Sequence, residues 1–195
     1  RLRSALAQLV AAVLALHGEH IIHRDLKPSN VMVDLEGHLA VLDFGLVLEG
    51  EREGISRNSE WFAGTPRYMA PEQGLAGTVT GAADWYAVGV MVYEALSGLP
   101  PYSGATPLQL LQNKAAHQPA PLANQPDALG DLARLAIELL HSDPDKRPDS
   151  FEVAKRVSAT APVAKSSSGT NLLVGREAQM ASLRSAQRQV EHDGQ

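Results

Sequence analysis

Residues 82–97 constrain the fold of this chain more than any other stretch. They predict a helix that carries apolar side chains on several of its faces, among them Trp85, Val88, Val92 and Leu96. Because such a helix has no polar face to turn toward water, we expect it to be buried at the centre of the core. The run Gly98-Leu99-Pro100-Pro101 then predicts its end.

Further helices are predicted by apolar residues at steps of three and four. The stretches are 2–16, with Gly18 as a left-handed cap, 107–116, with Thr106 as N-cap, 129–140, and 150–158, with Asp149 or Ser150 as cap. Two β-rich runs, 31–33 and 39–42, flank the turn 34–37 and predict a small hairpin. The predicted fold class is therefore mainly α with one small β-hairpin.

Composition excludes several function classes. A net charge of -5 argues against a nucleic-acid surface, and the absence of cysteine excludes disulfides and thiolate zinc sites. No apolar run approaches the roughly 20 residues that cross a membrane, so no membrane segment is expected in this chain. A cytoplasmic protein is the default expectation.

Two motifs carry the chemistry. The stretch His23-Arg24-Asp25-Leu26-Lys27-Pro28-Ser29-Asn30 supplies a base, a cation and an amide, and Asp43-Phe44-Gly45 supplies a second carboxylate. The predicted hairpin brings Asn30 and Asp43 to neighbouring strand ends, where oxygen ligands could share a hard cation. Either motif alone could equally be a turn with a solvated carboxylate. Their order, with Ala70-Pro71-Glu72 following, makes chance a poor explanation.

In that order the motifs resemble those of eukaryotic-type protein kinases. The resemblance covers residues 1–158, the larger, C-terminal lobe, and favours the serine/threonine branch as found in bacteria. It implies transfer of the γ-phosphoryl group of ATP to Ser/Thr hydroxyls of protein substrates, with Mg²⁺. By resemblance, Asp25 orients the hydroxyl and accepts its proton, and Lys27 contacts the transferring phosphate. Asn30 and Asp43 hold the metal ions, and Met32 lies beneath the adenine.

The resemblance also implies supporting roles. Asp84 accepts hydrogen bonds from the catalytic-loop backbone, although an ordinary helix N-cap would also explain it. Arg147 pairs with Glu72, unless it is a surface arginine. The remaining residues are His23 and Phe44 in the regulatory spine, Thr65 beside the catalytic aspartate, and Arg24 as receiver of a phosphate on Ser59.

The glycine-rich loop, strand lysine and glutamate of the smaller, N-terminal lobe are not found in the sequence, so the chain alone is not expected to turn over ATP. Its expected partners are that N-lobe, downstream domains and protein substrates. Residues 159–170 read as a linker. Residues 171–195 resemble the start of an AAA-type ATPase domain, with a frayed amphipathic tail as the alternative. A pseudokinase or interaction scaffold with a kinase fold is the rival function. A small-molecule phosphotransferase is a weaker one, because such enzymes lack the Ala-Pro-Glu segment.

Overall fold

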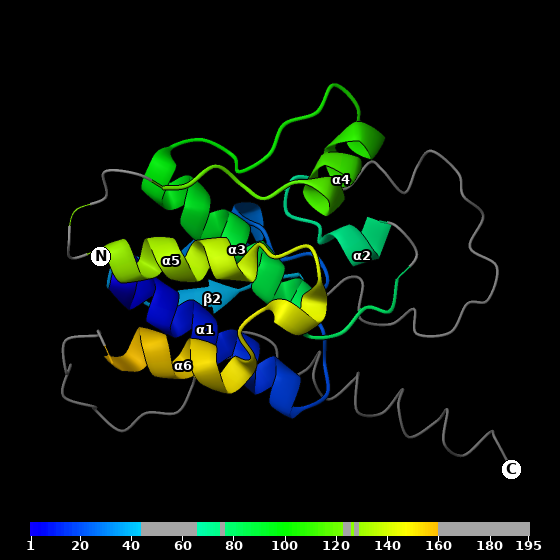
Figure 1. The fold of residues 1–195 in the computed structure, drawn as a ribbon. Coiled ribbons are helices and arrows are strands. Elements are labelled where there is room, and N and C mark those ends of the chain that lie inside the picture. The colour runs from blue at the N-terminus through cyan, green and yellow to red at the C-terminus, as the bar shows by residue number, and fades with distance from the viewer. Residues whose placement is uncertain (44–65, 75–76, 123–125, 127–128, 160–195) are drawn as a thin grey trace, which may run out of the picture. The chain divides into compact units, whose positions relative to one another are not determined.

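The computed structural model of the chain describes residues 1–43, 66–74, 77–122, 126 and 129–159. These residues form helices and one two-stranded antiparallel sheet, which confirms the predicted fold class (Figure 1). The α-helices are α1 (Leu2–Gly18), α2 (Pro71–Gly74), α3 (Ala82–Ser97), α4 (Pro107–Ala116), α5 (Gly130–Leu139) and α6 (Ser150–Ala159). The strands are β1 (Val31–Val33) and β2 (Leu39–Val41), and the short 3-10 helices are η1 (Pro28–Asn30) and η4 (Pro144–Lys146).

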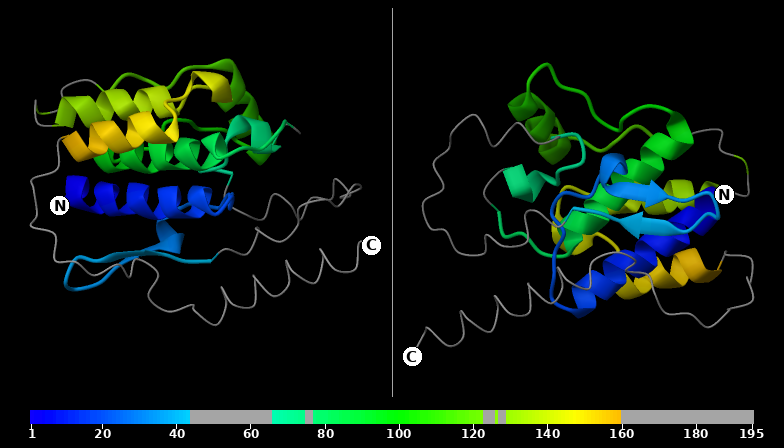
Figure 2. Two further views of the ribbon diagram at one scale, coloured as in Figure 1. Left: turned by 90° about the horizontal axis from the view of Figure 1, so that it is seen from below. Right: turned by 180° about the vertical axis from the view of Figure 1, so that it is seen from behind.

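Helix α3 is the buried centre of the core, as its apolar faces predicted. Ten of its residues are buried, and it runs between α5 and α1, with the hairpin on the far side of α1 (Figure 2). The close approach of α3 to α5 depends on Gly89. A Cβ added there would lie 2.8 Å from the Cβ of Leu139, closer than packed carbon atoms come.

The hairpin is fixed to α1 by one glutamine. Gln8 donates from Nε2 to the Gly37 carbonyl and accepts from the Leu39 N–H, both at 2.9 Å. Gly37 has a φ of +88°, which a glycine adopts without strain. The register pairs Val31 with Val41, so the residues on either side of the paired strands, Asn30 and Leu42, lie next to each other.

Helix ends follow local sequence in two cases and depart from it in one. Gly98 ends α3 with a φ of +72°, and the Thr106 hydroxyl accepts from the Gln109 N–H at the start of α4. The prediction that Gly18 is a left-handed cap is wrong. Gly18 stays helical, and His20 takes the positive φ of 59° instead. Two hydrogen bonds move the reversal there, because the Leu16 carbonyl accepts from both Glu19 and Ile21 N–H.

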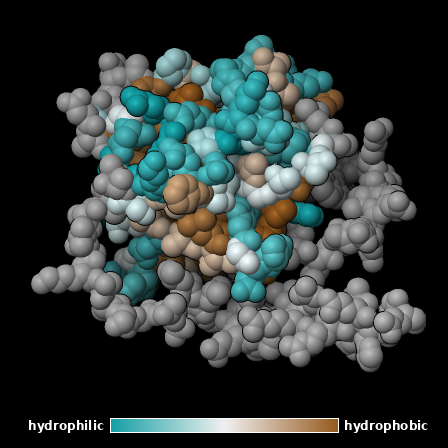
Figure 3. Space-filling view, turned by 60° about the horizontal axis from the view of Figure 1, so that its bottom comes forward, coloured by the Kyte–Doolittle hydropathy of each residue, from teal (hydrophilic) through white to brown (hydrophobic). Residues whose placement is uncertain are grey.

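The described surface is mostly hydrophilic on the face shown in Figure 3, with hydrophobic patches between the hydrophilic areas. Several large apolar side chains are exposed on the hairpin, including Met32 at 59% and Leu35 at its tip. Among the described residues, no helix combines the length and the apolar character that crossing a membrane needs.

Candidate active site

Two side chains of the 23–30 stretch, Lys27 and Asn30, converge on the Asp25 carboxylate. Lys27 Nζ lies 2.6 Å from Asp25 Oδ2. Asn30 donates from Nδ2 to the Asp25 carbonyl at 2.8 Å and to Oδ2 at 3.2 Å. Pro28 restricts the preceding Lys27 to an extended backbone, and it starts η1, whose turn brings Asn30 back toward Asp25. The structure therefore brings three of the predicted catalytic side chains together.

Asp84, at the start of α3, binds the backbone of this loop. Its carboxylate is 1% exposed and accepts from the backbone N–H groups of His23 and Arg24, both at 2.9 Å. His17 Nε2 lies 2.8 Å from the same carboxylate. Arg24 has a φ of +65°, a conformation that costs an arginine about 1–2 kcal/mol. The two bonds to a buried carboxylate offset that cost, so the turn before Asp25 is held in one conformation.

His23 connects the loop to the end of β2. Its fully buried ring accepts from the Asp25 N–H at Nδ1, at 3.3 Å, and donates from Nε2 to the Leu42 carbonyl at 3.1 Å. These partners define its neutral tautomer. The Leu42 N–H in turn donates to the Asn30 carbonyl at 2.8 Å. Both strand ends of the hairpin are therefore joined to the catalytic loop.

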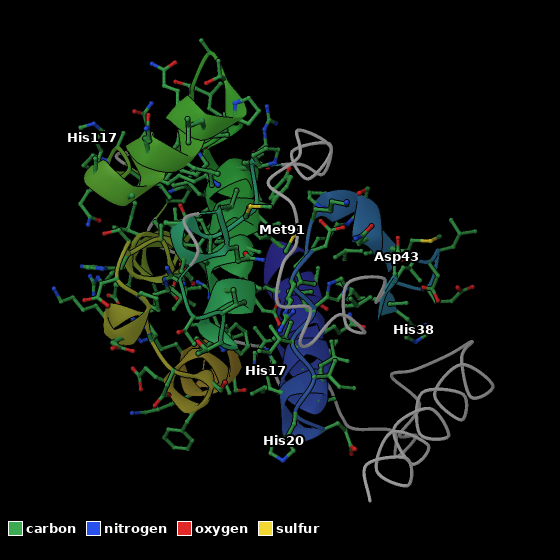
Figure 4. All side chains as sticks on the ribbon, turned by 90° about the vertical axis from the view of Figure 1, so that its right-hand side faces the viewer. His17, His20, His38, Asp43, Met91 and His117 are labelled. Carbon is green, nitrogen blue, oxygen red and sulfur yellow. The ribbon has the colours of Figure 1, made fainter. Side chains whose placement is uncertain are left out.

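Asp43 follows Leu42 directly, and its side chain is exposed at the end of the hairpin (Figure 4). Its φ of +61° is left-handed, which aspartate tolerates better than most residues. Within the described part of the chain, neither Asn30 Oδ1 nor the Asp43 carboxylate accepts a hydrogen bond. Two hard oxygen donors on adjacent segments fit a magnesium ion by their chemistry.

The Arg24 side chain is half-buried next to this site. Among the described residues, its Nε is buried and has no hydrogen-bond partner. The Arg24 carbonyl accepts from Gln73 Nε2 at 2.9 Å, which joins the catalytic loop to α2. The predicted partner residues Ser59 and Thr65, and the predicted spine residue Phe44, lie outside the described residues.

Glu72 and Arg147 form a buried pair between α2 and the segment after η4. The two guanidinium nitrogens lie 2.6 Å and 2.8 Å from the two carboxylate oxygens. Arg147 also donates to the carbonyls of Ala82 and His141, and its guanidinium lies 4.9 Å from the centre of the Tyr86 ring. The pair therefore fixes the Ala-Pro-Glu segment to the start of α3.

Three residues that hold the site were not predicted from the sequence. They are His17, Gln73 and Lys114. His17 and Gln73 contact Asp84 and Arg24 as described, and Lys114 binds the backbone of residues 66–69. A signal was present only for Lys114, since it lies three residues after the buried Leu111 and thus on the buried face of α4.

Comparison with known proteins matches residues 1–157 to the family described as protein kinase domain. The chain is 34% identical over 158 residues to the serine/threonine-protein kinase PkaA of Streptomyces coelicolor. It is 37% identical over 148 residues both to YPK2/YKR2 of Saccharomyces cerevisiae and to human Sgk2, two serine/threonine-protein kinases. These alignments cover 80%, 75% and 75% of the chain.

The same alignments span 28%, 21% and 39% of the length of those relatives. The family match nevertheless covers most of this chain and includes every site residue described above. The chain belongs to the protein kinase family.

Proposed function

We propose that this chain supplies the phosphoryl-acceptor side of a serine/threonine protein kinase active site. The observation that carries the proposal is the convergence of Lys27 and Asn30 on Asp25, with Asp43 on the adjoining strand end. Phosphoryl transfer needs in-line positioning of a hydroxyl and neutralisation of charge on the phosphate oxygens. These side chains match both needs.

Asp25 is the proposed base. Its carboxylate, 29% exposed, is open to a substrate hydroxyl, would orient it and would accept its proton. Lys27 would bind the transferring phosphate of ATP as a point charge. In the described structure Lys27 neutralises Asp25, so substrate binding would exchange that contact for one to phosphate.

Asn30 and Asp43 would hold Mg²⁺ through their side-chain oxygens. Bound Mg²⁺ would neutralise charge on the phosphate oxygens. Asn30 contributes a neutral oxygen, and its amide nitrogen keeps Asp25 oriented at the same time. Met32, exposed on β1, would lie beneath the adenine.

We further propose that residues 1–158 form the larger lobe and act with a smaller lobe that carries the glycine-rich loop, the strand lysine and its glutamate. Arg24 would receive a phosphate on Ser59, which would order the segment between Asp43 and Thr65. The buried Arg24 Nε supports that role. The proposal also includes a linker at 159–170 and the start of an AAA-type ATPase domain at 171–195. It further includes a bacterial source and a cytoplasmic location.

The test uses the full-length protein with γ-labelled ATP, Mg²⁺ and a mixture of protein substrates. We expect label on serine and threonine, lost on chelation of the metal and in Asp43→Ala. The matched control is Asp34→Ala, which removes an exposed aspartate from the same hairpin and should leave the transfer unchanged. ATP binding without any transfer by the wild type would favour the interaction scaffold instead.

A further inference from the structure

Lys114 is a buried lysine with an unusual set of partners. Its side chain lies on α4 and is 1% exposed. Its Nζ donates to the carbonyl oxygens of Pro66, Arg67 and Met69, each at 2.7 Å. An ammonium group has three N–H donors, so the three carbonyls use all of them.

The position of α4 brings this lysine to the segment. Gly74 at the end of α2 is in contact with Leu111, where any larger residue would clash with the leucine methyl groups. Lys114 follows Leu111 by three residues and therefore lies on the same face of α4. The residues preceding α2 are thus within reach of its ammonium group.

The charged and titratable groups that face Lys114 come from α3 and from the bound segment. The Tyr86 ring centre lies 5.3 Å from Nζ, and Glu94 is the carboxylate whose charge acts on it. Tyr68 donates its hydroxyl to Glu94 at 2.7 Å, and Arg67 lies 3.6 Å from the same carboxylate. Burial lowers the pKa of Lys114 to about 7, and Glu94 opposes that shift.

Burying a charged side chain in this space costs free energy, because the ammonium group loses its hydration. An apolar side chain of the same length would pack here without losing the hydration of a charge, which is why buried ion pairs are often replaceable by apolar residues. What the ammonium adds is a fixed geometry, since three carbonyls within four residues must all point at one atom. This constraint acts on the backbone of residues 66–69.

The same segment is joined to the catalytic loop at its other end. The Ala70 N–H donates to Gln73 Oε1 at 2.9 Å, and Gln73 Nε2 donates to the Arg24 carbonyl next to Asp25. Residues 66–70 are therefore held between α4 and the catalytic loop. Because Gln73 joins this segment to the residue next to Asp25, a peptide whose hydroxyl reaches Asp25 would pass beside it.

We propose that Lys114 is a positioning residue for the protein substrate, because its ammonium group holds residues 66–69 in the conformation against which the substrate peptide binds. Gln73 holds the other end of this platform. The proposal rests on the proposed kinase function.

The test compares Lys114→Met with the wild type in the full-length protein. Methionine keeps the apolar stem and removes the three donors. We expect KM for a peptide substrate to rise at least about tenfold, while KM for ATP changes less than about twofold. Hydrogen–deuterium exchange should accelerate in residues 67–73 and stay unchanged in α3 and α5. Gln73→Leu is a second variant, which should raise the peptide KM without changing hydrogen–deuterium exchange in α4.

Lys155→Met is the matched control, because that lysine on α6 is 67% exposed. An unchanged peptide KM in both test variants would overturn the proposal. An equal rise in KM for ATP and for the peptide, together with faster hydrogen–deuterium exchange in α3, would also overturn it, since that outcome means a purely structural role. A wild type that transfers no phosphate contradicts the proposed function, whereas the exchange difference still tests the platform.

Discussion

Removal of the Arg147 side chain should destabilise the fold more than any exposed substitution. Arg147 is 1% exposed at its side chain and Glu72 8% exposed. Arg147→Ala leaves the Glu72 carboxylate buried without its two charged donors, and it removes a donor from the carbonyls of Ala82 and His141. The uncompensated buried charge dominates the loss.

The magnitude follows from that burial. Removing one partner of a buried ion pair costs about 3–5 kcal/mol in unfolding free energy. For a chain of this size, 1 kcal/mol corresponds to about 2–4 °C in melting temperature. We therefore expect the melting temperature of Arg147→Ala to fall by roughly 6–20 °C.

Differential scanning calorimetry and guanidinium denaturation measure the loss. Arg134→Ala is the control, because Arg134 is exposed on α5 and should change stability by less than about 0.5 kcal/mol. Glu72→Ala and the double variant complete a double-mutant cycle, in which the double variant should lose much less than the sum of the two single losses. Equal melting temperatures for Arg147→Ala and the wild type would refute the reasoning.

Three further results are expected. Asp84→Asn should lower kcat about 10–100-fold in the full-length protein, because the loop before Asp25 loses its charged acceptor; an unchanged kcat contradicts this. Gly89→Ala should lower unfolding free energy by about 1–3 kcal/mol through its contact with Leu139, and a neutral result would mean that α3 and α5 can separate. Lys114 should make stability depend on pH. Between about pH 7 and 9 the unfolded chain, with the usual lysine pKa of 10.5, binds a proton that the folded chain releases, so raising the pH favours folding even though the neutral amine leaves one of the three carbonyls without a donor. Denaturant titrations should show the wild type gaining up to about 1.4 kcal/mol per pH unit relative to Lys114→Met, and parallel curves would contradict the lowered pKa.

The fold was predictable where local patterns decide it. The apolar faces of 82–97, the hairpin and the caps at Gly98 and Thr106 depend on residues close together in the chain. The end of α1 was not predictable in this way, because the hydrogen bonds to the Leu16 carbonyl select His20 rather than Gly18 for the left-handed position.

The site was predictable only in part for the same reason. Asp25, Lys27 and Asn30 lie within one short loop, so their spacing already implies proximity. His17, Gln73 and Lys114 act through partners that are 45 or more residues away in the sequence. A lysine near the end of an amphipathic helix is normally solvated, and only the carbonyls of residues 66–69 make its burial possible.

The most direct test of the central claim is the turnover rate of Asp25→Asn in the full-length protein, with Asp34→Asn as the matched control on the hairpin. Loss of the base should lower kcat by about 10²–10⁴-fold, while the melting temperature and ATP binding stay within error of the wild type. A kcat within about twofold of the wild type would contradict the assignment of Asp25 as the catalytic base.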